Sequence, residues 1–201
     1  MIGTGPGRTY PQETILDPRA IYGLLEYIVN LLEEMIVKAG GKNFERALVS
    51  ALNIMYIDYD IDALAYRRWA PPRVEQEMDI VSDSLEGKYY FAIECKSVDG
   101  RKTDSLYWSQ HFSATPAGHQ IDRECRWLRM TGRTGYLAVE IRSGSGSARE
   151  AYLYPYQQLA RIKKSTALGI SLDRIRSGVR LGRVGTQYTI DPDMIYMAGK
   201  V

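Results

Sequence analysis

The sequence has little cysteine, a small net charge and no long hydrophobic run, and each of these excludes a class of protein. Two cysteines among 201 residues, Cys95 and Cys125, argue against a disulfide scaffold and a structural zinc site. They fit a reducing cytosol, so we expect a cytoplasmic protein. No run of about 18 or more apolar residues is present, which excludes a membrane-spanning helix. The first eight residues have no apolar core, so we expect no secretory signal.

The net charge of +2 is too small to indicate a nucleic-acid partner, but the basic residues are unevenly distributed. Between residues 161 and 183 a basic segment contains one acid, Asp173, and seven cations: Arg161, Lys163, Lys164, Arg174, Arg176, Arg180 and Arg183. A second cluster consists of Arg67, Arg68 and Arg73. Stripes of this kind suit a phosphate backbone, although a solvated protein face is the alternative for each.

The N-terminal part of the sequence predicts an arm followed by two helices. Residues 1–16 are rich in glycine and proline and predict a loose arm. Asp17 followed by Pro18 is a helix-start signal, and apolar residues then recur at helical spacing over 19–39. We expect a second helix over 42–56.

Strand patterns dominate the rest of the sequence. Strands are predicted at 63–70, 77–82, 88–98, 134–142 and 152–154, and helices at 116–130 and 157–164. This order predicts an α/β fold with a mixed central β-sheet flanked by helices. We expect an N-terminal arm and helix over 1–40, a core over 41–145, and a C-terminal extension over 146–201 that packs on the core as one compact domain.

The segment with the most chemical information ends the strand predicted over 88–98. Alternate side chains of a strand share a face, so Glu94 and Lys96 should project together while Ile93 and Cys95 point the other way. A carboxylate and an ammonium group are costly to bury unpaired, and a divalent cation or a phosphate between them would offset that cost. A simple strand-end ion pair is the alternative.

Two further acids could join this pair. Asp79 lies on the neighbouring predicted strand, and an antiparallel hairpin would bring it beside Glu94. Carboxylates that converge repel one another unless a hard cation binds them, and oxygen ligands select Mg²⁺ or Mn²⁺. Glu45, at the edge of the second helix, could face the end of the sheet. The alternatives are an exposed strand-end aspartate and a solvated helical glutamate.

The order of these motifs resembles the PD-(D/E)XK nucleases. Gly41 and Glu45 on a helix are followed by an arginine-rich strand, Asp79, the pair Glu94 and Lys96, a helix and an apolar strand. Within that superfamily the sequence is most similar to the archaeal Holliday-junction resolvases and more weakly to the RecU resolvases. The similarity covers about residues 40–142 and includes Arg67–Pro71, Gln120 and the strand Gly135–Val139. Met78 stands where the motif has proline.

The resemblance implies a restriction-endonuclease-like core and assigns roles to single residues. Asp79 and Glu94, with the backbone carbonyl of Cys95, would hold Mg²⁺, for which Mn²⁺ would substitute. Glu45 would reach this ion directly or through water, or serve a second ion. Lys96 would orient the attacking water or stabilise the charged transition state. Gln120 would be a positioning donor.

The resemblance also implies contacts to DNA and a homodimer. The residues that would grip DNA are Arg67, Arg68, Arg73, Arg101 and Lys102. The last two share a loop with Tyr107 and Trp108, which could contact DNA strands or be core or dimer contacts. The helix over 19–39 would pack on the sheet or form a dimer seam, since a four-way junction needs two symmetric incisions.

Three functions remain open at this point. The leading hypothesis is a Mg²⁺-dependent, structure-selective DNA endonuclease that acts on four-way junctions in recombination and repair. The second keeps the same chemistry with another target, as in restriction or repair nucleases. The third is a DNA-binding module without catalysis, against which the complete acid–acid–lysine set argues.

Overall fold

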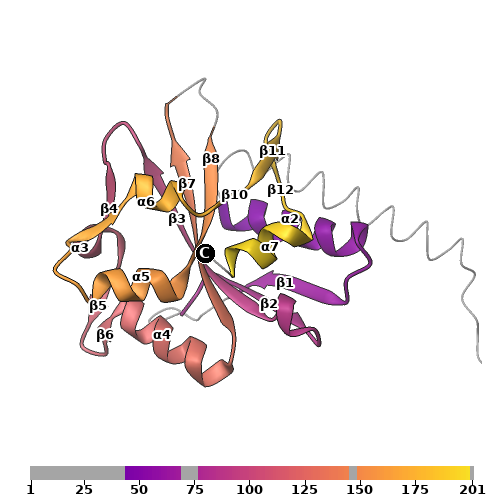
Figure 1. Ribbon diagram of the computed structural model, residues 1–201, viewed down its shortest axis with the longest axis horizontal. Helices are drawn as coiled ribbons and strands as arrows, with labels where there is room; N and C mark the ends of the chain where they lie inside the picture. Colours follow the sequence, from indigo (N-terminus) through magenta and orange to yellow (C-terminus); the bar gives the residue numbers. More distant parts are fainter. Residues whose placement is uncertain (1–43, 69–76, 145–148, 200–201) are drawn as a thin grey trace, which may run out of the picture. The chain divides into compact units, whose positions relative to one another are not determined.

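A six-stranded sheet runs through the part of the chain that the computed structural model describes, residues 44–68, 77–144 and 149–199 (Figure 1). In spatial order its strands are β1 (Ala63–Arg67), β2 (Ile80–Ser84), β3 (Phe91–Asp99), β7 (Thr134–Arg142), β8 (Glu150–Pro155) and β10 (Val179–Arg180). The β3–β7 pair is parallel, and all other neighbours are antiparallel. The predicted α/β fold with a mixed central sheet flanked by helices is therefore confirmed.

Helices flank both faces of this sheet, with α2 and α7 on one side and α4 and α5 on the other (Figure 1). The helices are α2 (Phe44–Asp58), η1 (Gly87–Tyr89), α3 (Trp108–His111), α4 (Gln120–Thr131), α5 (Tyr156–Lys163), α6 (Leu172–Arg176) and α7 (Pro192–Ala198). Three small ladders pair β4 (Ser105–Tyr107) with β9 (Gly169–Ser171), β5 (Ala114–Thr115) with β6 (Gly118–His119), and β11 (Gly182–Val184) with β12 (Gln187–Thr189). No helix among the described residues is long and apolar enough to cross a bilayer.

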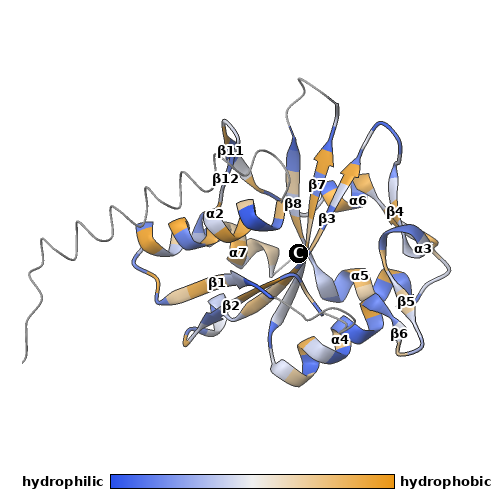
Figure 2. Ribbon diagram, turned by 180° about the vertical axis from the view of Figure 1, so that it is seen from behind, coloured by the Kyte–Doolittle hydropathy of each residue, from blue (hydrophilic) through white to orange (hydrophobic). Residues whose placement is uncertain are grey.

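Each face of the sheet has its own hydrophobic core, and β3 and β7 contribute to both. The first core lies under α2 and contains Ile93 and Leu52, with Cys95 packed against it. The second core lies under α4 and α5 and contains Ala92 and Leu137. Hydrophobic colours accordingly cover much of β3 and β7 in Figure 2. The alternation along β3 places Glu94 and Lys96 on the face of the second core, as the strand pattern predicts.

Most predicted elements of the core are confirmed, but several bounds differ. The strand predicted over 77–82 lies at Ile80–Ser84, so Asp79 stands just before it, and the strand predicted over 88–98 begins only at Phe91. The helix predicted over 116–130 begins only at Gln120. Pro116 instead lies in the turn of the β5–β6 hairpin, and Gly118 there has a φ of 111°, which favours glycine. His119 caps the helix, since its Nδ1 accepts a hydrogen bond of 3.2 Å from the backbone N–H of Ile121.

The C-terminal third of the chain supplies part of the central sheet. The expected boundary between 145 and 146 falls in the connection between β7 and β8, which are paired along most of their length. β10 then extends the sheet beyond β8. The predicted arm over 1–16, the helix predicted over 19–39 and Arg73 lie outside the described residues.

Met78 has a backbone conformation that proline, the residue of the resembling motif, cannot adopt. This residue is fully buried and has a φ of 61°, in the left-handed region of the backbone. Proline holds φ near −65° and could not adopt this conformation.

The expected effect of Met78→Pro is therefore a loss of more than about 3 kcal/mol in the free energy of unfolding. Denaturant titration measures it, and Met78→Leu, which conserves volume, should cost less than about 1.5 kcal/mol. Equal stability of the two variants would contradict this backbone assignment.

Candidate active site

The β2–β3 hairpin brings Asp79 and Glu94 to the same point. Its register pairs Ile80 with Ile93, so one further step places Asp79 opposite Glu94. The backbone N–H of Asp79 donates to the carbonyl of Ile93 at 3.0 Å. The side chain of Asp79 accepts a hydrogen bond of 2.8 Å at Oδ2 from the backbone N–H of Cys95. Residues 16 positions apart in the sequence are thus held next to each other by main-chain contacts.

Lys96 lies against Glu94 on the face of the second core. Its Nζ atom is 2.7 Å from Oε1 of Glu94, whose side chain is 4% exposed, and it lies 5.0 Å from the centre of the Phe112 ring. Burial lowers the pKa of Lys96, but the charge and hydrogen bond of Glu94 outweigh it, so the pKa is raised. Lys96 is therefore a fixed positive charge beside the acids.

Both acids of the hairpin have a pKa raised to about 7. For Asp79, burial raises the pKa most and the charge of Glu94 adds to it, while the hydrogen bond from Cys95 lowers it. For Glu94, burial again contributes most, followed by the charge of Glu124. Buried acids that repel one another are stabilised by a proton or by a cation between them.

Gln120 connects Glu94 to a second buried glutamate that the sequence patterns did not single out. Its Nε2 donates to Oε1 of Glu94 at 2.6 Å and to Oε1 of Glu124 at 2.8 Å, and its Oε1 accepts from the backbone N–H of Ser113 at 3.1 Å. Glu124 is fully buried and also accepts a hydrogen bond from the hydroxyl of Tyr156. Gln120 is therefore oriented at both ends of its amide, and it fixes the position of Glu94.

Glu45 is close to the site, but its carboxylate already forms an ion pair with an arginine. Nη2 of Arg67 lies 2.6 Å from Oε2 of Glu45, and Nε of Arg67 donates to the same oxygen at 2.8 Å. The charge of Glu45 still raises the pKa of Asp79. Within the described ranges, no group of three or more histidine, cysteine or acidic side chains is placed to hold a metal ion. A direct metal contact of Glu45 stays a prediction.

The remaining donor set fits a hard cation. Mg²⁺ in proteins is held by one or two carboxylates and keeps several waters. Asp79 and Glu94 supply two such carboxylates, both of which are destabilised by their surroundings as long as no cation neutralises them. The chemistry of the site thus fits Mg²⁺ or Mn²⁺ with water completing the coordination.

Arg68 contacts the backbone of the segment that contains Asp79. Its backbone N–H donates to the carbonyl of Asp79 at 2.9 Å, and its Nη1 donates to the carbonyl of Glu77. The guanidinium carbon is 4.9 Å from the centre of the Trp127 ring on α4. Stacking on an aromatic ring holds a guanidinium group in one orientation. A contact of Arg68 with a DNA phosphate stays a prediction.

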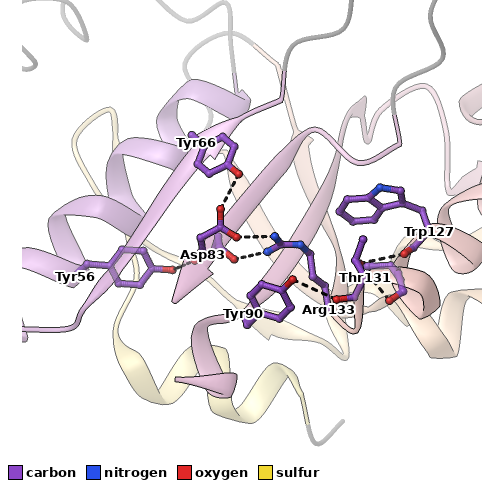
Figure 3. A network of polar contacts seen from close by, with 9 residues as sticks. Tyr56, Tyr66, Asp83, Tyr90, Trp127, Thr131 and Arg133 are labelled. Atoms are coloured by element: carbon purple, nitrogen blue, oxygen red, sulfur yellow. Dashed lines mark hydrogen bonds and ion pairs between the residues drawn. The ribbon is translucent and has the colours of Figure 1, made fainter. Parts of the chain in front are cut away.

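Arg133 has a structural role in the network of Figure 3. It donates to the carbonyl of Ser82 at 2.8 Å and to Oδ1 of Asp83 at 2.5 Å. Its guanidinium carbon lies 3.9 Å from the centre of the Tyr90 ring and 6.0 Å from that of Trp127. These contacts connect β2 to the beginning of β7 and to α4, so Arg133 holds the elements around the site together.

The other predicted DNA contacts lie at the end of β3. Arg101 is exposed and donates through Nε and Nη2 to the carboxylate of Asp99 at 2.9 and 2.8 Å. Lys102 is exposed in the turn that follows. Trp108 packs against the second core and donates from Nε1 to the carbonyl of Ala167 at 2.7 Å, which favours a core role for this ring.

Comparisons with known proteins give only distant likenesses, among solved structures. No protein family model matches the sequence, and no curated protein matches it. Among solved structures, the chain is similar to Hjc, a Holliday junction resolvase from the archaeal hyperthermophile Archaeoglobus fulgidus, with 16% sequence identity and a TM-score of 0.38. The match covers 64% of this chain and 92% of that chain. A likeness this distant says nothing of activity, which has to be inferred from the side chains of the site.

Proposed function

We propose that the chain is a metal-dependent endonuclease that hydrolyses phosphodiester bonds in DNA, with four-way junctions as its favoured substrate. The observation that carries this proposal is the pair of opposed carboxylates, Asp79 and Glu94, both with a pKa raised to about 7, beside the ammonium group of Lys96. A structural ion pair needs one acid for one base. Here a second buried acid, Asp79, lies beside Glu94. Its burial and the repulsion between the two carboxylates cost free energy, which a divalent cation would offset.

Each residue of this set has a distinct task in phosphodiester hydrolysis. A bound divalent cation would supply the charge that neutralises the phosphate as the bond to the attacking water forms. Asp79 and Glu94 would hold that cation, and Gln120 keeps Glu94 in place. Lys96 would orient the attacking water or stabilise the added negative charge, as a point charge that burial keeps in one position.

The preference for junctions and the homodimer rest on the order of the sequence motifs, since two symmetric incisions need two sites. With Mg²⁺, we expect the full chain to cut a labelled four-way junction at least about tenfold faster than a flap or a linear duplex of the same sequence, a difference of about 1.4 kcal/mol in activation free energy. EDTA should stop the reaction. Equal rates on all three DNAs would leave the chemistry intact and remove the junction preference. No cleavage of any of them with Mg²⁺ or Mn²⁺ would overturn the proposed function.

A further inference from the structure

A basic groove runs between α4 and α5, away from the acids of the candidate active site. It has a volume of about 480 Å³, and its floor includes Leu128, Gly135 and Ala160. A neighbouring hollow of about 260 Å³ shares Gly135 and Arg161 with it and continues toward α7. The groove is therefore an elongated depression rather than an enclosed small-molecule cavity.

The walls of the groove carry four cations, Arg129, Arg133, Arg161 and Lys164, and among the described residues its lining includes no acid. Arg133 is engaged by Asp83, whereas the other three are exposed and form no ion pair within the described part of the chain. Cys125 also lines the groove: burial raises the pKa of its thiol, the charges of Asp122 and Glu124 raise it further, and the charges of Lys164 and Arg129 lower it. Cations that line one groove repel one another, and an anion between them would relieve that repulsion.

A chain of hydrogen bonds inside the protein links the groove to the candidate active site. Tyr156 lines it, and the hydroxyl of Tyr156 donates to Glu124, which accepts from Gln120 beside Glu94. Along α4, Arg129 lies nine residues after Gln120, which corresponds to about 14 Å at a helical rise of about 1.5 Å per residue. A duplex covers that length in about four base pairs.

We infer that the groove between α4 and α5 binds the phosphate backbone of the substrate DNA a few base pairs away from the cleavage site, through Arg129, Arg161 and Lys164. This inference rests on the proposed function and adds a second contact region to it. The two halves of the basic segment 161–183 thereby receive different roles. In the second half, Arg176 pairs with Asp173 and Glu150, and Arg174 donates to the hydroxyl of Tyr154. In the first half, Lys163 pairs with Asp122, whereas Arg161 and Lys164 face the groove.

The test compares two variants that lose the same charge. One carries Arg129→Gln, Arg161→Gln and Lys164→Gln; the matched control carries Arg174→Gln, Arg176→Gln and Arg180→Gln. Binding to a short fluorescent duplex is measured by anisotropy in EDTA over a range of salt concentrations, which separates it from cleavage and from metal binding. Each phosphate contact contributes about 0.9 to the slope of log affinity against log salt. We expect the groove variant to lose about 2 to 3 from this slope and roughly 10- to 100-fold in affinity at 0.1 M salt.

The control variant should keep most of its slope, and Arg161→Gln alone should lose about 1. Equal slopes for the groove variant and the wild-type chain would overturn the groove and leave the proposed function standing. A groove variant that loses binding of inorganic pyrophosphate but keeps its DNA binding would also overturn the inference about the groove, because the groove would then hold a small anion. This result too would leave the proposed function standing. A wild-type chain without salt-dependent DNA binding would overturn both.

Discussion

Glu94→Gln and Asp79→Asn are each expected to reduce Mg²⁺-dependent DNA cleavage by at least about a thousandfold and to leave DNA affinity in EDTA nearly unchanged. Both substitutions keep the size of the side chain and replace a charged carboxylate with a neutral amide. A divalent cation contributes several kcal/mol of charge stabilisation, and about 4 kcal/mol corresponds to a thousandfold in rate. DNA affinity should persist because it depends on the cations that meet the phosphates rather than on the acids. Single-turnover cleavage and anisotropy measure the two effects separately.

Two acids of the same sheet serve as matched controls. Asp83 lies four residues after Asp79 and pairs with Arg133, and Glu140 is a buried glutamate of β7 whose Oε1 lies 3.3 Å from Arg149. Asp83→Asn and Glu140→Gln remove the same charges from side chains that, in the ranges that the structure describes, form no hydrogen bond or ion pair with Asp79, Glu94 or Lys96. They should therefore keep cleavage within about tenfold of the wild-type rate once folding is verified. Cleavage that survives in Asp79→Asn or Glu94→Gln would remove that residue from the active site.

The parts of the site that could be predicted from the sequence are those whose geometry is set by a local repeat. Glu94 and Lys96 are two residues apart, so the strand period alone places them on one face of β3. Asp79 follows once β2 and β3 form a hairpin, because the pairing of adjacent strands is the simplest connection. β7 has the bounds that its apolar run predicts, since a strand covered on both faces reads as a continuous hydrophobic segment.

The parts that could not be predicted depend on side chains that break the local pattern. α4 buries Gln120, Arg123 and Glu124, so its polar residues resemble those of a surface helix although they face the second core. The spacing of four residues between Gln120 and Glu124 was the available signal, because such residues share one face of a helix. β4 and β9 pair across more than 60 residues, and nothing local in either segment indicates its partner. Sequence patterns are expected to fail where polar groups are buried for function.

The stability of the metal-free protein should change with pH in a way that Asp79→Asn reduces but does not abolish, because Glu94 keeps a raised pKa. The folded protein holds a proton on Asp79 and on Glu94 up to about pH 7, whereas the unfolded chain releases these protons near pH 4. Below pH 4 both states are protonated, so burial of these groups has no electrostatic cost. As the pH rises from 4 to above 7, the folded state becomes progressively less favoured. Asp79→Asn should therefore match the wild type at pH 4 and exceed it in unfolding free energy by roughly 2–4 kcal/mol at pH 8.

Two controls make this prediction specific: the addition of Mn²⁺, and a substitution of Asp83, whose pKa is lowered where that of Asp79 is raised. Mn²⁺ at about 100 times its dissociation constant should stabilise the wild type at pH 8 by about 2.7 kcal/mol and should have little effect on Asp79→Asn. The pKa of Asp83 is lowered: burial raises it, but its hydrogen bonds with Tyr66 and Arg133 prevail. Asp83→Asn should therefore destabilise the protein at pH 8, and this loss should shrink as the pH falls through the pKa of Asp83. If Asp79→Asn instead destabilised the protein at pH 8 as Asp83→Asn does, Asp79 would be part of a structural ion pair, and the cation site would have to be abandoned.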